Sequence, residues 1–421
     1  MTNAADIAIV GGGAAGLATG IFAARLMPLR SVVVLDGAGK LGAKILVSGG
    51  GRCNVTNRVV TAADFCGGSP HLIKQVLATF PVAHTVAFFQ EIGVELYEED
   101  DGKLFPKTNR APTVLEAMVG EAVRLGVRIL PRHRVSNMRR GASGFHIAAG
   151  ANSLFAGKVV LATGGQSFPK TGSDGSGYRL AEELGHTLVP PTPALVPLVM
   201  DGDFHVPLSG ISHNVELTVQ AAGRKPVRVC GVLLWTHFGV SGPAVLDVSR
   251  HWHRARLEQR DVAMFANLVP GDDPDGLEGR LLALASAQPR LQLHNALARL
   301  LPARVADALL GALGIPGTIL MAHLPKEFRR HVARALVRWP LPVRDSRGYS
   351  HAEVTAGGVP LTEVDARSLG SRKCPGLYFA GEILDVDGRI GGFNFQWAWA
   401  SAWVVATALA RAVKPDGPSV R

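Results

Sequence analysis

The sequence predicts an α/β fold whose main domain has a parallel sheet with helices on its faces and is interrupted by a second domain. A short apolar run at residues 7–10 leads into glycines with G-x-G-x-x-G spacing. A helix is expected over residues 14–26, followed by an apolar strand over 31–35. From about residue 190 prolines and short β-like segments replace this alternation, which resumes near residue 353. The pattern is typical of a Rossmann-like domain with an insertion.

Each glycine of the first turn has an expected role. Gly11 permits the tight turn, Gly13 lets a pyrophosphate approach the backbone, and Gly16 lets the helix pack close to the sheet. The expected helix begins at Ala14, and the free N–H groups of Ala14 and Ala15 with the partial positive charge of the helix end attract phosphate. The turn therefore predicts a dinucleotide site, with a glycine-rich turn of unrelated purpose as the alternative.

The segment after the second strand adds polar groups. Asp36 ends that strand, where its carboxylate can accept hydrogen bonds from a ribose. The loop over 48–57 combines three glycines with donor side chains, and loops on a rigid sheet often carry sites. A surface loop is the alternative. The residues expected to contact the cofactor here are Lys44, Ser48, Gly50, Gly51, Arg52 and Asn54.

Two later segments are also expected at the cofactor. An apolar strand over 158–162 ends at Thr163 and Gly164. Near the C-terminus, a strand over 376–381 delivers a glycine and an acid, and a helix is expected over 396–413. In two-domain flavoproteins such an acid approaches the ribityl chain, and such a helix end stabilises an anionic reduced flavin. The expected contacts are Gly381, Glu382, Asp387, Gly391, Gly392, Asn394 and Phe395. An ordinary strand, loop and helix is the alternative.

Length and composition favour two domains. The chain has 421 residues, and we expect a discontinuous cofactor domain over 1–190 and 346–421 and an inserted domain over 191–345. Four scattered cysteines form no C-x-x-C pair, which argues against a zinc or dithiol site and suits a reducing compartment. The N-terminus lacks a signal pattern, so a cytoplasmic location is expected. The uncharged stretch 390–410 is interpreted as a loop and a core helix, not a membrane span.

Several motifs together resemble one family. They lie at residues 11–20, 41–44, 48–57, 163–165, 172–177, 236–243, 355–359 and 379–396, and the S-G-G-G-R-C-N block at 48–54 is the most specific. On these residues the chain resembles the BaiN/RdsA family of NAD(P)/FAD-dependent oxidoreductases. The resemblance implies FAD in a two-dinucleotide-binding-type fold with an inserted β-barrel plus helical domain. It also implies reduction of ribosomal RNA uridine or transformation of bile acids. Asp36 stands where many relatives have glutamate.

Flavin chemistry needs a hydride source and an acid beside the acceptor carbon. No second dinucleotide fingerprint is found in the sequence, so NAD(P)H is expected to dock transiently, or another donor serves. Cys53 is one candidate acid, because Arg52 could lower its pKa if the thiol is exposed. His237, in an aromatic turn, is the other. For both residues a buried structural role is the alternative.

Basic residues raise the question of an RNA partner. The formal net charge is +10, and Lys326, Arg330, Arg334 and Arg338 recur every four residues as one helical stripe. A second basic cluster over 250–260 contains Trp252. Cations beside an aromatic ring can bind phosphates and stack a base, although a solvated helix face is the alternative. Three functions stay open: reduction of ribosomal RNA uridine, reduction of a small steroid-like molecule, and non-catalytic FAD binding.

Overall fold

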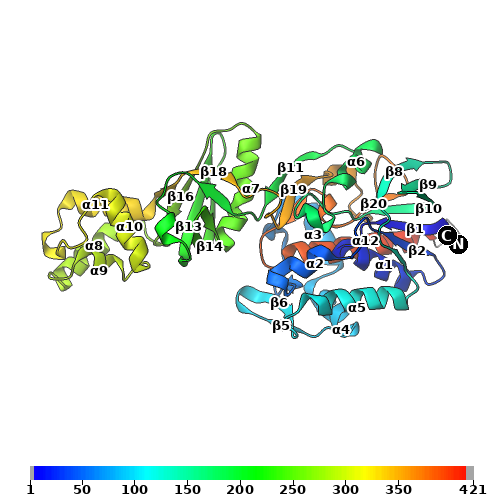
Figure 1. Cartoon of the computed structure of the whole chain (residues 1–421), viewed down its shortest axis with the longest axis horizontal. Helices are drawn as coiled ribbons and strands as arrows, with labels where there is room; N and C mark the ends of the chain where they lie inside the picture. Colours follow the sequence, from blue (N-terminus) through cyan, green and yellow to red (C-terminus); the bar gives the residue numbers. More distant parts are fainter. Residues whose placement is uncertain (1–3, 414–421) are drawn as a thin grey trace, which may run out of the picture. The chain divides into compact units, whose positions relative to one another are not determined.

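The computed structural model describes residues 4–413, shown in Figure 1. The chain divides into two compact units. The first unit comprises Met1–Thr192 and Glu353–Arg421, and the second comprises Pro193–Ala352. Each unit has a hydrophobic core of its own, which is what allows each to be described as a separate folding body.

The first unit is built on a seven-stranded sheet with the order β7-β2-β1-β10-β9-β8, and β20 also pairs with β10. The pairings of β1 with β2 and β10, of β2 with β7 and of β10 with β20 are parallel, whereas β8, β9 and β10 form an antiparallel edge. The strands are β1 (Ala4–Val10), β2 (Val32–Leu35), β7 (Arg128–Leu130), β8 (Val135–Arg140), β9 (Phe145–Ala149), β10 (Asn152–Leu161) and β20 (Leu377–Phe379).

The register of this sheet positions the site. Val10 lies opposite both Leu35 and Leu161, and Leu161 lies opposite Phe379. The carboxyl ends of four parallel strands therefore meet at one edge. The loops that follow them begin with the glycine turn, Asp36, Thr163 and the segment at 380–382. Ligands of open α/β sheets bind at this edge.

Helices cover the sheet, and α1 (Ala14–Leu26) packs against α12 (Phe393–Val413). Helix α1 occupies the range that the sequence predicts, whereas α12 begins three residues before its predicted start at residue 396. The other helices are α2 (Ala43–Val47), α3 (Pro70–Thr79), α4 (Val82–Glu91), α5 (Ala111–Arg124) and α6 (Ser176–Glu183). Small antiparallel pairings join β3 (Thr56–Asn57) and β5 (Leu96–Glu98) to β6 (Lys103–Pro106), and β4 (Phe65–Gly67) to β21 (Val386–Gly388). Strand β11 (Val189–Ala194) pairs with β19 (Val354–Gly358).

Helical periodicity over residues 71–92 predicts one helix, but two are present. The break falls at Phe80 and Pro81, because proline lacks an N–H and disfavours helical geometry in the residue before it. By length and composition the combined stretch 70–91 is apolar enough to cross a membrane, a test that core helices also pass. The uncharged stretch at 390–410 forms most of α12, and most of its side chains are buried in the core.

The second unit contains an antiparallel sheet with the order β17-β16-β13-β14-β15-β12-β18. Its strands are β12 (Leu198–Met200), β13 (Ser212–Ala221), β14 (Val227–Thr236), β15 (Gly239–Ser241), β16 (Val262–Asn267), β17 (Trp339–Leu341) and β18 (Val343–Ser346). The hydrogen-bonded order ends at β17 and β18, and within residues 4–413 no ladder joins these two strands. The expected closed β-barrel is therefore not confirmed.

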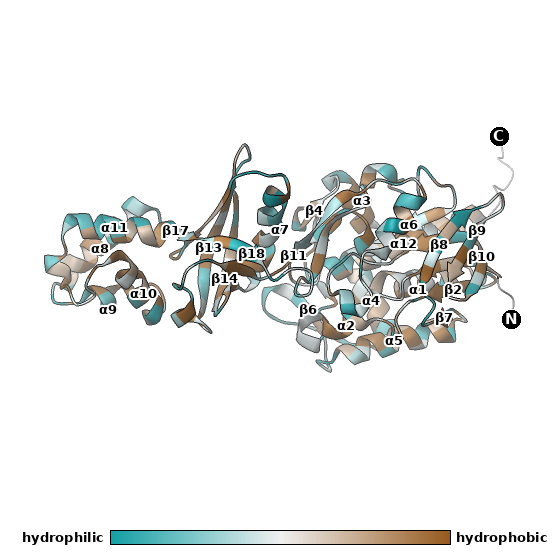
Figure 2. Cartoon of the chain, turned by 45° about the horizontal axis from the view of Figure 1, so that its top comes forward, coloured by the Kyte–Doolittle hydropathy of each residue, from teal (hydrophilic) through white to brown (hydrophobic). Residues whose placement is uncertain are grey.

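Helices complete the second unit. Helix α7 (Pro243–Leu257) packs against β13 and β14. A helical group follows β16, comprising α8 (Pro274–Ala287), α9 (Leu293–Leu297), α10 (Ala303–Leu313) and α11 (Lys326–Val337). Figure 2 shows hydrophilic residues on α11, which carries the predicted basic stripe.

Candidate functional site

In the glycine motif that joins β1 to α1, Gly11 and Gly16 are required by close packing, whereas Gly13 lies beside open space. A Cβ on Gly11 would lie 2.4 Å from the Ala162 carbonyl oxygen, and one on Gly16 would lie 1.8 Å from the Gly11 oxygen. Gly13 is the N-cap residue of α1, where no side chain caps the helix. A Cβ on Gly13 would meet no atom within 4 Å. The start of α1 thus presents uncapped N–H groups to open space, as a pyrophosphate site requires.

Asp36 lies against this turn. One carboxylate oxygen accepts a hydrogen bond of 2.6 Å from the Gly12 N–H, and the other accepts one of 2.7 Å from the Ala38 N–H. These bonds fix the carboxylate at the tip of β2. Each oxygen has a further lone pair for a ribose hydroxyl, so the residue fits its predicted role.

Two buried hydroxyls lie beside the next strand end. Within the described part of the chain, Thr163 Oγ1 and Ser173 Oγ are buried and have no hydrogen-bond partner. A Cβ on Gly164 would lie 2.9 Å from Ser173 Oγ, and one on Gly11 would lie 3.0 Å from Thr163 Cα. A Cβ on Gly177 of α6 would lie 1.8 Å from Thr163 Oγ1, so this hydroxyl packs against α6.

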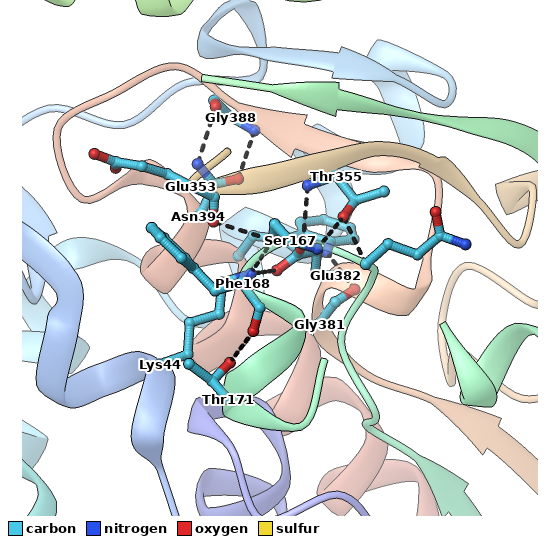
Figure 3. Close-up of polar contacts among 12 residues, drawn as sticks. Lys44, Ser167, Phe168, Thr171, Glu353, Thr355, Gly381, Glu382, Gly388 and Asn394 are labelled. Atoms are coloured by element: carbon cyan, nitrogen blue, oxygen red, sulfur yellow. Dashed lines mark hydrogen bonds and ion pairs between the residues drawn. The ribbon is translucent and has the colours of Figure 1, made fainter. Parts of the chain in front are cut away.

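Four segments meet in the polar network of Figure 3. Lys44 Nζ lies 2.6 Å from Glu382 Oε2 and donates to Ser167 Oγ at 2.5 Å. Glu382 Oε1 accepts from the Thr355 N–H at 2.9 Å and from Ser167 Oγ at 3.1 Å. The network joins α2, the loop after β10, β19 and the segment after β20.

Two residues that the sequence assigns to the cofactor, Lys44 and Glu382, bind each other in this network. Lys44 and Glu382 come together, but they bind each other, so the lysine charge is neutralised locally. Ser167 and Thr355 complete the network, although the sequence assigns neither a role. Thr355 lies in the motif at 355–359, which was the available signal. The four residues hold in place the loops that surround the expected cofactor.

The glycine-rich loop at 48–57 lies against the start of α12. Thr56 Oγ1 donates to Gln396 Oε1 at 2.7 Å, and Asn57 Nδ2 donates to the Gly391 oxygen at 3.2 Å. A Cβ on Gly392 would lie 2.5 Å from the Thr56 backbone. The two segments expected to cover the flavin are therefore packed together.

Within this loop, Gly50 and Gly51 have φ of 69° and 84°. A Cβ on Gly50 would meet no atom within 4 Å, so its backbone is open to a ligand. The positive φ itself requires glycine at both positions. Ser48 differs, because its hydroxyl donates to the Ile45 oxygen within the protein. Asn54 is buried.

Side chains near α12 are mostly used inside the protein. The Asn394 amide accepts from the Gly388 N–H at 2.8 Å and donates to the Gly388 oxygen at 2.9 Å. The Phe395 ring stacks on Trp399, and Asp387 is buried in β21. The groups that suit a flavin ring here are backbone N–H groups at Gly391 and the first turn of α12, because the Gly392 N–H lies 3.1 Å from the Asn54 amide oxygen that accepts it.

Arg52 and Cys53 occupy different surroundings from those expected. Arg52 forms an ion pair of 2.7 Å with Glu99, and its guanidinium lies 4.1 Å from the Phe105 ring centre. Cys53 is fully buried, and burial raises the pKa of its thiol to about 12. The structure therefore favours the buried alternative for Cys53, because the expected lowering of its pKa by a cation is absent.

His237 lies in the turn between β14 and β15 and is exposed, which corrects the buried alternative considered for it. Its ring packs edge-on against Phe238, with centres 5.1 Å apart. Of the two candidate acids, His237 is the one that a large substrate can reach.

All four residues of the predicted stripe on α11 are exposed. Glu278 of α8 lies 3.1 Å from Arg330 and reduces the charge at that position. Arg338, which caps the end of α11, lies over Phe265 with its guanidinium 3.8 Å from the ring centre. The stripe is therefore a surface feature, as predicted, with its cations in unequal surroundings.

The second predicted cluster, over 250–260, is only partly a basic surface, because Arg256 is exposed while Arg254 and Arg260 are half-buried. Arg250 and Trp252 are buried, and the tryptophan belongs to the core of the second unit. Burial lowers the pKa of His251 and of His253 to about 4, so both rings are neutral at pH 7. Arg250 and the two histidines therefore add little charge to the surface of α7.

Comparisons with known proteins place the chain in a family. Residues 5–408 match the family model described as HI0933-like protein Rossmann domain. The chain is 34% identical over 423 residues to a ribosomal RNA dihydrouridine synthase of Haemophilus influenzae, covering 98% of this chain and 100% of that protein. It is 32% identical over 404 residues to a 3-dehydro-bile acid delta(4,6)-reductase of Clostridium scindens, covering 96% and 98%.

Solved structures show the same fold. A 3-ketosteroid delta1-dehydrogenase from Sterolibacterium denitrificans aligns with a TM-score of 0.53 and 12% identity, covering 98% of this chain and 100% of that chain. A quinol-fumarate reductase aligns with a TM-score of 0.53 and 16% identity, covering 99% and 73%. The chain belongs to the HI0933-like family and is an FAD-dependent oxidoreductase with a Rossmann-type domain.

Proposed function

We propose that this protein uses FAD and NAD(P)H to reduce a C=C bond, specifically that of a uridine in ribosomal RNA, giving dihydrouridine. The observation that carries the RNA substrate is the exposed stripe Lys326, Arg330, Arg334 and Arg338 on α11. Similarity alone does not decide between substrates, because the dihydrouridine synthase and the bile acid reductase resemble this chain about equally. An exposed row of cations suits phosphates and has no use in binding an apolar ring.

The first unit has the groups that hold FAD. The N–H groups at the start of α1 would bind the pyrophosphate beside Gly13, and Asp36 would bind a ribose. The backbone at Gly391, with the positive end of α12, would face the flavin ring. The chemistry that FAD supplies when bound is hydride transfer between a nicotinamide and a carbon acceptor.

The second hydrogen must arrive as a proton from an acid beside the acceptor carbon. We assign this role to His237 as the candidate to test, because its side chain is exposed whereas Cys53 is enclosed in the core. In the protonated state the imidazolium can donate from either ring nitrogen. A His237→Asn variant should keep bound FAD but lose most of the product formation.

A second function is favoured by a specific observation. The Clostridium scindens relative is named for a bile acid reduction and matches nearly the whole chain. If this protein reduced a similar small apolar molecule, the cations of α11 would be dispensable for turnover. Charge reversal on α11 therefore separates the two functions.

The test is dihydrouridine mapping on ribosomal RNA from a strain lacking the gene and from its parent. We expect one dihydrouridine to disappear and to return with the wild-type gene. The double variant Lys326→Glu with Arg334→Glu should restore much less. A matched control, Lys74→Glu with Arg367→Glu, makes the same charge change at exposed positions of the first unit and should restore it fully. An unchanged map in the deletion strain would refute the RNA substrate.

The affinity for RNA should also fall with salt concentration, with a slope set by the number of phosphates that the stripe contacts. Four phosphate contacts on single-stranded RNA give a slope of about −3 in log affinity against log salt. Affinity should then fall about 50-fold between about 50 mM and 200 mM salt. Fluorescence anisotropy with labelled RNA measures this, and an affinity that does not change with salt would contradict the stripe as the RNA site.

A further inference from the structure

One face of the sheet in the second unit is open. Along β13, Val215, Leu217 and Val219 are buried in the core that includes residues of α7. The alternate residues, including Thr218 and Gln220, point to the other face, because successive strand residues alternate. Gln220 is exposed and Thr218 is half-buried.

Neighbouring strands extend this open face. Thr218 lies opposite Arg228 of β14 and opposite Phe265 of β16. Arg228 and the nearby Cys230 are exposed, and Phe265 is half-buried. A row consisting of a cation, a hydroxyl and an aromatic ring therefore crosses three adjacent strands.

Arg338 lies where this face meets the basic stripe of α11. Its guanidinium is 3.8 Å from the Phe265 ring centre, and its Nη2 donates to Gln220 Oε1 at 3.1 Å. Both supporting residues belong to the open face, whereas the arginine ends α11. Two contacts thus hold a planar cation in one orientation while the residue stays exposed.

We propose that Arg338, supported by Phe265 and Gln220, is a stacking platform for an unpaired base of the bound RNA. This inference rests on the proposed function and specifies how its RNA is held. Guanidinium planes stack on bases, and a side chain that is already fixed loses little freedom on binding. Lys326 and Arg334 are exposed on the same stripe and would bind the adjoining phosphates. The protein would therefore prefer an unpaired RNA segment to a duplex.

The experiment compares two probes in anisotropy titrations of the full chain: a labelled oligouridine of about twelve nucleotides, and the same strand annealed to oligoadenosine. Arg338→Lys keeps the charge but removes the planar group. We expect about tenfold weaker binding to the single strand, with the same salt slope, and a change of less than about twofold for the duplex. The control Arg290→Lys makes the same substitution at an exposed position outside the stripe and should match the wild type.

A second pair of variants tests the support. Phe265→Leu removes the ring beneath the guanidinium, and Gln220→Ala removes its hydrogen bond. Each should weaken single-strand binding several-fold. If the leucine variant loses its thermal unfolding transition, the Gln220→Ala result decides this part.

The results that would contradict the stacking platform differ from those that would contradict the proposed function. Wild-type affinity in Arg338→Lys, or an equal loss on both probes, would overturn the stacking platform and leave the proposed function intact if dihydrouridine still depends on the gene. Failure of the wild-type protein to bind either RNA would overturn the stacking platform, whereas an unchanged dihydrouridine map in the deletion strain would overturn the proposed function.

Discussion

Replacing Gly13 by alanine separates cofactor binding from folding. Gly13 has φ of −82° and ψ of −166°, which alanine adopts without strain, and its Cβ would meet no atom within 4 Å. The free energy of unfolding of the apoprotein should therefore change by less than about 0.5 kcal/mol. The same methyl group would fill the space assigned to the pyrophosphate. Loss of two charge-assisted hydrogen bonds costs at least about 3 kcal/mol, which is more than about 100-fold in the Kd for FAD.

Two measurements are needed, urea unfolding of the apoprotein and a fluorescence titration with FAD. Gly120→Ala is the matched control, because its Cβ also meets no atom within 4 Å, but it lies inside α5. It should gain about 0.5–1 kcal/mol of stability and bind FAD normally. Gly11→Ala should fail to fold, because φ is +107° and its Cβ would approach the Ala162 oxygen to 2.4 Å. A Gly13→Ala protein that binds FAD within about threefold of the wild type would refute the assignment of this space.

Four further predictions concern buried or half-buried groups. Gln396→Leu should cost about 2–4 kcal/mol in chemical denaturation, because the buried amide bonds to Thr56, Thr85 and the Phe80 oxygen, and all three would lose a partner; a loss below about 1 kcal/mol would contradict this. Burial holds the pKa of His186 below its ordinary value, so protonation of this ring favours the unfolded chain. The free energy of unfolding should therefore fall as pH drops below about 6.5, and the variant His186→Gln should show a smaller fall. Burial alone would raise the pKa of Glu363, but hydrogen bonds from Lys373 and Thr187 hold this pKa at about 2. The stabilisation that the Glu363 carboxylate contributes should therefore be lost as pH falls from about 4.5 towards 2. Unfolding curves measured at several pH values test both residues, and a free energy of unfolding that does not fall over these pH ranges would count against the assignments for His186 and Glu363. Because burial raises the pKa of Cys53 to about 12, iodoacetamide at about pH 8 should label exposed Cys230 in the folded protein but not Cys53, and equal labelling in peptide mass spectra would refute its burial.

Sequence reasoning succeeded where the signal is local. The glycine spacing and two apolar strands predicted β1, α1 and β2, with α1 at its observed bounds. The break at Pro81 was missed although it is a local signal, because the apolar periodicity over 71–92 continues across it. The order of the strands in the second unit depends on their neighbours in space, and the β-rich sequence segment did not reveal it.

The site was predictable as a set of loops but not as a set of contacts. Lys44 and Glu382 are 338 residues apart, and their pairing follows from the order of β1, β10 and β20 in the sheet, which the sequence pattern does not encode. Arg338 was predicted as one cation among four. Its contact with Phe265 depends on how α11 meets β16, so no sequence spacing distinguishes it from Arg334.

The most direct test of the proposed function is reconstitution. Purified protein with FAD is incubated with NADH or NADPH and with ribosomal RNA from the deletion strain, and dihydrouridine is measured by nucleoside mass spectrometry. We expect dihydrouridine only when flavin and a nicotinamide are both present, and little product from Gly13→Ala or from Lys326→Glu with Arg334→Glu. Absence of dihydrouridine, together with rapid NAD(P)H oxidation on a steroid-like enone, would contradict the proposed function.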